Sequence, residues 1–315
     1  MISEELLTEY HALTAGAGYV DVSDRTKIEL RGPDRSTFLH NFCTNDIKRL
    51  QPGQGCEAFL CNVKGHVLAH VAVLCSETSV WLDTVPGQAE KIVAHLDRYL
   101  IREKVEIYDR TSDFNSLLVS GEASLDLFKG VLHAPFTFND FGAQGYVVSH
   151  DITSHLCVLC NQPLGSMQLT EEAMASGSPL PCSNAALEIA RVEHGFPLYG
   201  IDITDDNLPQ EVARNTQAIS FTKGCYLGQE TVARIDALGH VNRTLCGVSW
   251  TGEVVPPIGA ELSAGDKVVG RVTSACWSPK LASPLALAYI RRGQDTPGTL
   301  LVSEYGPATV VSLPV

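Results

Sequence analysis

The part of the chain that follows Gly239 restricts the possible folds more than any other segment of the sequence. It is made of short strand-like runs that glycine and proline interrupt, at residues 245–250, 267–275, 286–291, 299–303 and 308–313. Closely spaced strands without intervening helices are typical of a small barrel or sandwich, here of about 75 residues. We therefore expect a domain boundary near residue 240, with one unit in residues 1–239 and a β-barrel domain in residues 240–315.

The preceding residues mix helical and strand-like patterns, which is typical of an α+β architecture. Residues 3–13 carry apolar side chains at helical spacing, and residues 88–100 repeat that pattern. A β-hairpin is expected where residues 57–63 and 66–74 flank a Lys-Gly pair, because glycine suits a tight connection between strands. The sequence therefore predicts an α+β region followed by a β domain.

The chain of 315 residues carries a formal net charge of −13. A general nucleic-acid binder presents basic surface to phosphates, so this charge argues against direct nucleic-acid binding. No apolar run reaches the roughly 18–20 residues that a membrane-crossing helix needs. Residues 1–13 lack both the apolar stretch of a secretory signal and the Arg-rich character of a transit peptide. We therefore expect a cytoplasmic protein without a membrane partner.

The ten cysteines are expected to be reduced thiols in that compartment. Only Cys157 and Cys160 form a C-x-x-C pair, and they lie in the strand-like residues 155–160. Side chains i and i+3 of a strand face opposite sides, so this pair is poorly placed to chelate a metal or to act as a dithiol. We interpret both as packing residues, because a free cysteine behaves as a small apolar side chain. No resident metal site is expected.

The segment Lys223-Gly224-Cys225-Tyr226-Leu227-Gly228-Gln229-Glu230 combines several chemical signals. Residues 227–235 have helical content, which the i,i+4 spacing of Glu230 and Arg234 supports. Cys225 is therefore expected at or just before a helix N-terminus, two residues from Lys223. Both the helix dipole and the cation favour the thiolate there, which makes Cys225 the candidate reactive thiol. A half-buried cysteine in a tight turn is the alternative that the residues leave open.

Helix N-termini also favour anionic ligands, so Lys223 and Arg234 are candidates to neutralise a carboxylate tail; simple solvation of both is the alternative.

A second cluster lies at residues 183–195, a helix that Gly195 is expected to end. Charged residues at 188, 191 and 193 interrupt its apolar pattern, so at least one is expected to face a pocket. A carboxylate suits an amino-pyrimidine edge, because it accepts two N–H bonds at once. A Glu188–Arg191 surface pair is the alternative.

Residues 223–234 match the pattern K-G-C-[FY]-x-G-Q-E-x-x-x-[RK] in full, and this pattern is the signature of the YgfZ branch of the glycine-cleavage T-protein superfamily. Residues 30–39 resemble the opening of that superfamily, residues 191–200 its central folate segment and residues 270–289 its C-terminal barrel. The chain thus resembles the superfamily over nearly its full length, and the YgfZ branch most closely.

The resemblance implies three lobes in a ring around a central tetrahydrofolate channel, with two interwoven α+β lobes before the barrel. It implies that Glu193 reads the pterin edge, that Lys223 and Arg234 lie near the folate or its glutamyl tail, and that Cys225 lies beside the channel. The residues that it assigns to tetrahydrofolate binding are Arg191, Glu193, Lys223, Tyr226, Gln229 and Arg234, and the candidate catalytic residues are Cys225 and Lys223.

One stretch departs from the T-protein pattern. T-proteins have a Gly-Gly-Ile-x-Asp-Asp-like stretch that supplies an acid for aminomethyl transfer, whereas residues 65–70 here read Gly-His-Val-Leu-Ala-His without a carboxylate. A positioned acid–base group typically contributes about 100- to 10,000-fold in rate. This departure argues against ordinary glycine-cleavage activity. His70 is a candidate to replace the acid, and a structural histidine on a strand is the alternative.

Three functions compete on these grounds. The leading hypothesis is a tetrahydrofolate-binding accessory protein that assembles or repairs iron–sulfur enzymes, mainly [4Fe–4S], and so indirectly supports tRNA modification, with transient contacts to those enzymes or to assembly factors. The alternative is a folate-dependent one-carbon transferase of the aminomethyltransferase or demethylase kind. A permanent cluster carrier is the third, and the absence of a Cys₄ spacing argues against it.

Overall fold

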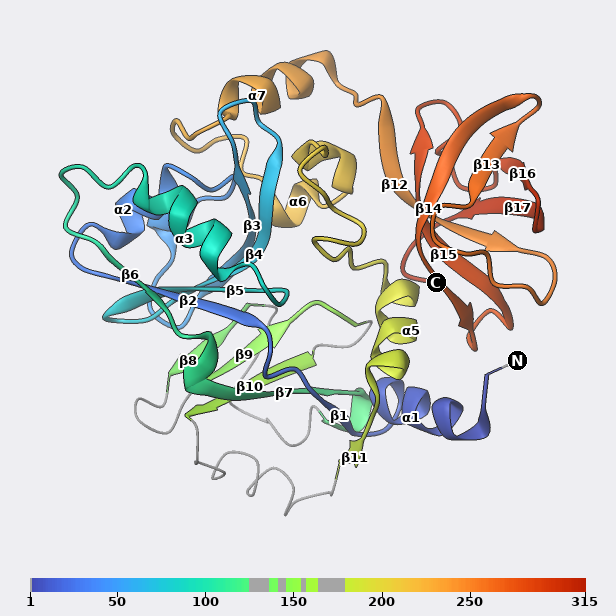
Figure 1. The fold of residues 1–315 in the computed structure, drawn as a ribbon, viewed down its shortest axis with the longest axis horizontal. Helices are drawn as coiled ribbons and strands as arrows, with labels where there is room; N and C mark the ends of the chain where they lie inside the picture. The colour runs from blue at the N-terminus through green and yellow to red at the C-terminus, as the bar shows by residue number, and fades with distance from the viewer. Residues whose placement is uncertain (1, 125–135, 141–145, 154–156, 164–178) are drawn as a thin grey trace.

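A computed structural model shows three packed units and describes residues 2–124, 136–140, 146–153, 157–163 and 179–315 (Figure 1). Figure 1 shows one sheet at the left, a second sheet below it and a barrel at the right, with α6 and its connecting loops between them. Within the described ranges, no helix combines the length and the apolar character that crossing a membrane requires.

The first unit is a five-stranded antiparallel sheet in the order β3-β4-β5-β2-β6. On one face, alternating apolar side chains pack against two helices, and the other face of the central strands is buried as well. The elements are β2 (Thr26–Arg31), α2 (Arg35–His40), β3 (Gly55–Cys61), β4 (Val67–Cys75), β5 (Ser79–Thr84), α3 (Ala89–Asp97) and β6 (Glu106–Asp109), with the 3₁₀ turn η1 (Ile47–Arg49). The predicted hairpin is confirmed as β3 and β4, and the predicted helix at residues 88–100 as α3.

The second unit is a six-stranded sheet in the order β11-β1-β7-β10-β9-β8. The chain enters this unit at β1, builds the first sheet and returns at β7, so the two lobes are interwoven. The elements are α1 (Glu4–Thr14), β1 (Gly18–Asp21), η2 (Thr111–Asp113), β7 (Phe114–Ser120), β8 (Phe138–Asp140), β9 (Tyr146–His150), β10 (Cys157–Pro163), β11 (Leu180–Pro181) and α5 (Asn184–His194). Cys157 and Cys160 lie on β10, as the strand-like pattern predicted.

The third unit is a closed six-stranded barrel in the order β12-β15-β14-β13-β16-β17. Its interior is filled by small and branched apolar side chains, among them Val248, Leu262 and Ile290. The strands are β12 (Arg243–Trp250), β13 (Glu261–Ala264), β14 (Lys267–Ser278), β15 (Ser283–Arg291), β16 (Leu300–Ser303) and β17 (Gly306–Val311). Of the two architectures that the sequence predicted, the barrel is therefore the correct one.

The segment between α5 and the barrel lies where the three units meet, and it positions the candidate site. It contains the 3₁₀ turn η5 (Pro209–Val212), α6 (Asn215–Ala218) and α7 (Gln229–Leu238). Ser183 caps the N-terminus of α5 by accepting the Ala186 N–H, and Gly195 ends the helix in the left-handed region with φ of 83°. Both ends of α5 are thus where the sequence predicted them.

Candidate functional site

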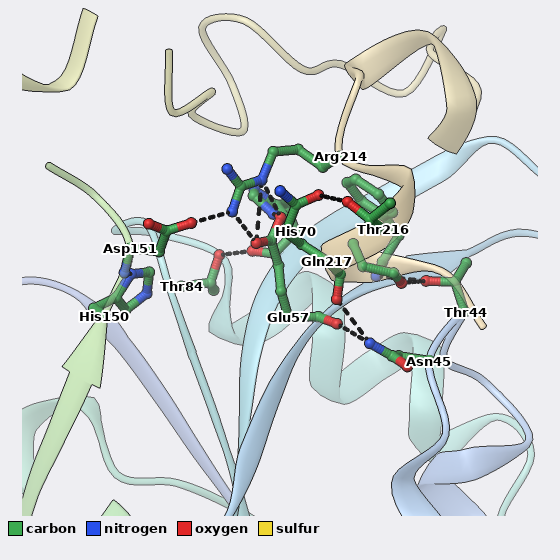
Figure 2. A network of polar contacts seen from close by, with 12 residues as sticks. Thr44, Asn45, Glu57, His70, Thr84, His150, Asp151, Arg214, Thr216 and Gln217 are labelled. Carbon is green, nitrogen blue, oxygen red and sulfur yellow. Dashed lines mark hydrogen bonds and ion pairs between the residues drawn. The ribbon is translucent and has the colours of Figure 1, made fainter. Parts of the chain in front are cut away.

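A buried network of charged side chains occupies the junction of the two sheets, and Arg214 is its centre (Figure 2). Arg214 lies between η5 and α6. Its Nε donates to Glu57 Oε1 at 2.8 Å and to Oε2 at 3.2 Å, and its Nη2 donates to Glu57 Oε2 and, at 2.9 Å, to Asp151 Oδ2. Glu57 comes from β3 and Asp151 follows β9. The guanidinium therefore ties both sheets together through two carboxylates.

His70 completes the network from β4, the strand next to Glu57. Its Nε2 lies 2.6 Å from Glu57 Oε1. The imidazole stacks between two phenyl rings, with centroids 4.9 Å from Phe59 and 5.4 Å from Phe196. The Arg214 guanidinium lies 5.1 Å from the Phe196 centroid. Residues 65–70 supply no carboxylate of their own, but the neighbouring strand brings one to His70.

The charges of this network are fixed by mutual pairing. Burial alone would raise the pKa of Glu57, but His70 and Arg214 outweigh burial and bring that pKa to about 2. The pKa of Asp151 is also lowered: burial opposes this shift, and His194 and Arg214 produce it. Its Oδ1 lies 3.0 Å from His194 Nε2. Both carboxylates are therefore ionised at neutral pH, with Arg214 as their common counter-ion.

Two cavities adjoin the network. The first, called the outer cavity, has a volume of about 480 Å³, and its polar lining residues are Asp151, His194, Arg214, Gln217 and Asp295. Its apolar walls are formed by Val212, Leu245, Val310, Val311 and Leu313. The inner cavity is lined by Glu57 and His70 and has a volume of only about 20 Å³. The network thus contributes Asp151 and Arg214 to a ligand-sized space, and Glu57 and His70 to a space for about one water molecule.

The inner cavity is enclosed by further buried polar side chains. Arg25 pairs with Asp83, and both line the cavity together with His150. Burial lowers the pKa of His150 to about 3, so its imidazole is neutral. The His150 ring contacts Phe136 and Phe196 edge-on. This cavity is therefore a rigid polar and aromatic core rather than an open binding site.

Lys223 is buried and holds a loop of the first lobe. Its Nζ donates to the carbonyl oxygens of His40 at 2.6 Å, Cys43 at 2.6 Å and Asn45 at 2.9 Å. Burial lowers the pKa of Lys223 to about 8. Because its three donors are used by backbone carbonyls, Lys223 in this structure connects two loops rather than facing a ligand.

Tyr226 and Gln229 also have structural partners. Tyr226 packs in an apolar cluster with Phe59 and Val232, and the Tyr226 N–H donates to Gln229 Oε1 at 3.3 Å. Gly228 has φ of 81°, and a Cβ there would lie 2.5 Å from the Asn62 carbonyl oxygen in the β3–β4 hairpin. Only glycine fits this close approach. The segment therefore builds a rigid loop against the hairpin.

Cys225 is exposed at the surface of this loop, four residues before α7 begins. Among the cysteines whose side chains the structure describes, the other seven are buried or half-buried. Nothing is described of the side chains of Cys157 and Cys160. Arg234 is exposed on α7. The structure thus separates the predicted residues of this segment into an exposed pair, Cys225 and Arg234, and a buried structural set.

Arg191 on α5 is buried rather than part of a surface pair. Its side chain is 1% exposed, and it donates to Glu188 at 2.8 Å, Asp202 at 2.8 Å and Ser274 at 2.8 Å. These contacts join α5 to β14 of the barrel. Arg191 therefore acts as a connector between units in this structure.

Glu193 is buried on the same helix. Tyr10 Oη donates to its Oε2 at 2.7 Å, while Ser278 Oγ and the Lys280 N–H, at 3.3 Å, donate to Oε1. Both carboxylate oxygens are thus occupied by groups of α1 and the barrel. Reading a pterin edge with Glu193 would require these hydrogen bonds to be exchanged, and that role stays a prediction.

Sequence reasoning missed Glu57, Asp151 and Arg214. Glu57 had one usable signal, since it is the only charged residue in the strand Gly55–Cys61, and a lone carboxylate in an apolar strand needs a buried partner. Asp151 and Arg214 had no local pattern, because Arg214 meets Glu57 across 157 residues and meets Asp151 across 63 residues. In the described ranges, no group of three or more His, Cys, Asp or Glu is placed to hold a metal ion.

Comparison with known proteins identifies the family. Residues 2–154 match the model of the GCVT N-terminal domain, and residues 243–315 match the glycine cleavage T-protein C-terminal barrel domain. The chain belongs to the glycine cleavage T-protein superfamily. The barrel match begins at the first residue of β12.

Named relatives agree with this assignment. The chain is 26% identical to an aminomethyltransferase of Chlorobium luteolum, over 98% of this chain and 90% of that protein. It is 25% identical to a putative chloroplastic transferase of Arabidopsis thaliana, over 93% of this chain and 70% of that protein. The fold is similar to the crystal structure of aminomethyltransferase T from Bartonella henselae, with a TM-score of 0.90, 21% identity, and coverage of 98% of this chain and 89% of that chain.

Proposed function

We propose that this chain binds tetrahydrofolate and serves as a YgfZ-type accessory protein in the assembly or repair of iron–sulfur enzymes, mainly [4Fe–4S] enzymes. The observation that carries the proposal is the loop at residues 223–229, which the buried side chains of Lys223 and Tyr226 anchor and which presents Cys225 to solvent. That role implies transient contact with iron–sulfur enzymes or assembly factors. It also implies an indirect effect on tRNA modification.

The outer cavity is the proposed folate site. Small-molecule pockets usually have volumes of about 300–1,000 Å³ and apolar walls with a few polar groups. The outer cavity has this size and character, and the inner cavity does not. A pterin has flat apolar faces and a donor-rich edge, which match the aliphatic walls and the ionised Asp151. Arg214 supplies the positive charge for an anionic part of the ligand.

Calorimetric titration with tetrahydrofolate tests this site, and one site per chain is expected. Asp151→Asn removes the carboxylate charge beside Arg214 and keeps Asp295, the other carboxylate of the cavity, and we expect Kd to rise at least about tenfold. Glu193 does not line the outer cavity, so Glu193→Ala should leave Kd unchanged when the ligand lies there and should weaken binding only when Glu193 reads the pterin edge. Glu261→Gln on the exposed barrel surface is the matched control and should leave Kd unchanged.

The two variants separate two placements of the ligand. A loss of affinity in Glu193→Ala alone would move the pterin away from the outer cavity. The absence of any heat or thermal shift with wild-type protein would remove folate binding altogether.

A complementation experiment tests the iron–sulfur role. Cells that lack the gene should lose activity of [4Fe–4S] enzymes under oxidative stress, including radical-SAM tRNA thiolation, and a wild-type copy should restore it. Cys225→Ala should fail to restore it, whereas Cys182→Ala, which removes a half-buried thiol, should succeed. Full rescue by Cys225→Ala would contradict the proposed role of this thiol.

A second candidate is a folate-dependent one-carbon transferase, and the Glu57–His70 pair is the observation that favours it. The pair supplies an acid–base group where residues 65–70 alone supplied no carboxylate. Since Glu57 stays ionised down to about pH 2, His70 would have to carry the proton. Incubation with tetrahydrofolate and an aminomethyl or N-methyl donor tests this function. Formation of methylene-tetrahydrofolate that His70→Gln abolishes would favour the transferase over the accessory role.

A further inference from the structure

The outer wall of the barrel carries large apolar side chains that the proposed folate site does not use. On β16, Leu300 is 75% exposed and Val302 is 60% exposed. Ile258, in the loop before β13, and Val268 on β14 are exposed as well. Figure 1 shows β13 and β16 on the side of the barrel that faces away from the two sheets. Such side chains indicate an interaction surface where they are contiguous.

The register of the strands makes this surface contiguous. Val268 on β14 pairs with Ser263 on β13, and Ser263 pairs with Val302 on β16. Val302 in turn pairs with Pro307 on β17, so one row crosses four strands. Residues that pair directly across a sheet point to the same face, and the exposure of Val302 shows that this face is the outer one. Leu300 lies two residues from Val302 and therefore on that face too.

The same row crosses the least paired junction of the barrel. Ser263–Val302 is the single register pair between β13 and β16 in the described structure, whereas the other neighbouring strands share four or more pairs. A strand edge without a partner presents backbone N–H and C=O groups to which another extended chain can pair. A groove of about 840 Å³ follows this junction, lined by Ile258 and Ala260 on the β13 side and by Val302 and Ser303 on the β16 side. The groove thus offers both backbone pairing and apolar contact to an extended segment.

The charge of the groove distinguishes among possible occupants. Among the described residues that line it, Glu261 and Glu304 are charged and none is a lysine or an arginine; Arg271 pairs with Glu261 from β14. A second copy of this chain would bring like charges together, and the whole chain carries −13, so self-association on this face is unfavourable. An anionic membrane surface is unfavourable for the same reason. The occupant that fits is an apolar segment with basic side chains at its ends.

We propose that the β13–β16 groove is the docking surface for a partner protein, which contributes an extended apolar segment flanked by basic side chains. The segment pairs with the free edge of β13 and places its apolar side chains on Ile258 and Val302. Its basic side chains lie near Glu304, and this charge complementarity favours association with a basic partner. The inference rests on the proposed function, since the partner is taken to be an iron–sulfur enzyme or an assembly factor.

Fluorescence anisotropy with a synthetic peptide tests the surface. The probe is Lys-Lys-Val-Thr-Val-Thr-Val-Lys-Lys with an N-terminal fluorescein and a C-terminal amide, and its control has glutamate in place of each lysine. The full-length protein should bind the basic peptide saturably, and the acidic peptide at least about tenfold more weakly, because like charges then face each other. Val302→Lys should weaken binding of the basic peptide at least about tenfold. Ile101→Lys, at an exposed apolar position in the loop after α3, is the matched control and should leave binding unchanged.

Three results would overturn the docking surface. The first is wild-type protein that does not bind the basic peptide saturably, and the second is folded Val302→Lys that binds it as tightly as wild type. Substitution of an exposed side chain is expected to leave folding intact, and Ile258→Lys is the second variant if Val302→Lys does not fold. The third is a wild-type dimer in sedimentation velocity that the lysine substitution dissociates, which would make a second copy the occupant of the groove.

Complementation separates this inference from the proposed function. In cells that lack the gene, Val302→Lys should restore less [4Fe–4S] enzyme activity than Ile101→Lys does. Both variants should bind tetrahydrofolate with unchanged Kd, because the groove shares no lining residue with the outer cavity. A wild-type copy that restores nothing would remove the proposed function and leave the peptide result standing. Equal rescue by wild type and Val302→Lys would keep the function and remove the groove as the place where its partner docks.

Discussion

Arg191 and Arg214 are two buried arginines with nearly the same chemistry and different surroundings. Each guanidinium binds two carboxylates: Arg191 binds Glu188 and Asp202, and Arg214 binds Glu57 and Asp151. Each also joins two units of the fold. Charge and hydrogen bonding alone therefore do not indicate which of the two arginines belongs to a functional site.

The surroundings separate the two. The Arg191 and Asp202 side chains are 1% and 0% exposed, and neither lines a cavity described above. Asp151, by contrast, is 26% exposed and lines the outer cavity with Arg214. A buried ion pair by itself is weak evidence of function, because it also serves packing and specificity. Its position on the wall of a ligand-sized cavity is the stronger indication.

Replacement of Arg191 should give the largest loss of stability. Arg191→Met leaves Asp202 buried without its counter-ion, which typically costs about 3–5 kcal/mol. Urea unfolding measures the free energy of unfolding, and the exposed Arg271→Met, paired with Glu261 at the barrel surface, is the control with an expected change of about 0–1 kcal/mol. The fraction that remains folded should bind tetrahydrofolate with unchanged Kd. An Arg191→Met variant that loses affinity for tetrahydrofolate but keeps its free energy of unfolding would contradict the distinction between the two arginines.

Replacement of Arg214 should cost less stability and more affinity. Glu57 keeps His70 as a partner and Asp151 keeps His194 and some solvent, so Arg214→Met should lower the free energy of unfolding by about 2 kcal/mol. The same change removes the positive group from the outer cavity, so tetrahydrofolate binding should weaken at least about tenfold. Unfolding in urea and calorimetry on the folded variant measure the two effects. If Arg214→Met keeps its affinity for tetrahydrofolate, then Arg214 only connects two units of the fold, as Arg191 does.

The fold was more predictable than the site, and particular elements show why. Five of the barrel strands follow from local composition, because a strand with one buried face carries its own alternating pattern. The missed strand, β13, has the four residues Glu-Leu-Ser-Ala and a Gly on each flank, so nothing local distinguishes it from a turn. Its pairing with β14 is a tertiary effect.

The site depends on such tertiary effects throughout. Glu57, Asp151 and Arg214 converge only after two sheets have packed, and no spacing along the chain encodes that. Lys223 was expected to face an anionic ligand near a helix N-terminus, and lysine is rarely fully buried. Its burial follows from three carbonyl oxygens that the loop after α2 leaves without partners. Cys225, predicted at or just before a helix N-terminus, lies exposed four residues before α7, and its reactivity stays a prediction.

The acid limb of the stability profile tests the Arg214 network most directly. Native Glu57 stays ionised to about pH 2, whereas in the unfolded chain it takes up a proton near its ordinary pKa of 4.5. Between those values the unfolded state binds one more proton, so stability falls as pH is lowered, by at most about 1.4 kcal/mol per pH unit.

Glu57→Gln should remove that slope, and Glu261→Gln should keep it. Arg214→Met should move the window to higher pH, because Glu57 then loses a cation that lowers its pKa. Urea unfolding in steps from about pH 5.5 to 2.5 measures all three, and an identical slope in Glu57→Gln would assign the acid sensitivity to another carboxylate.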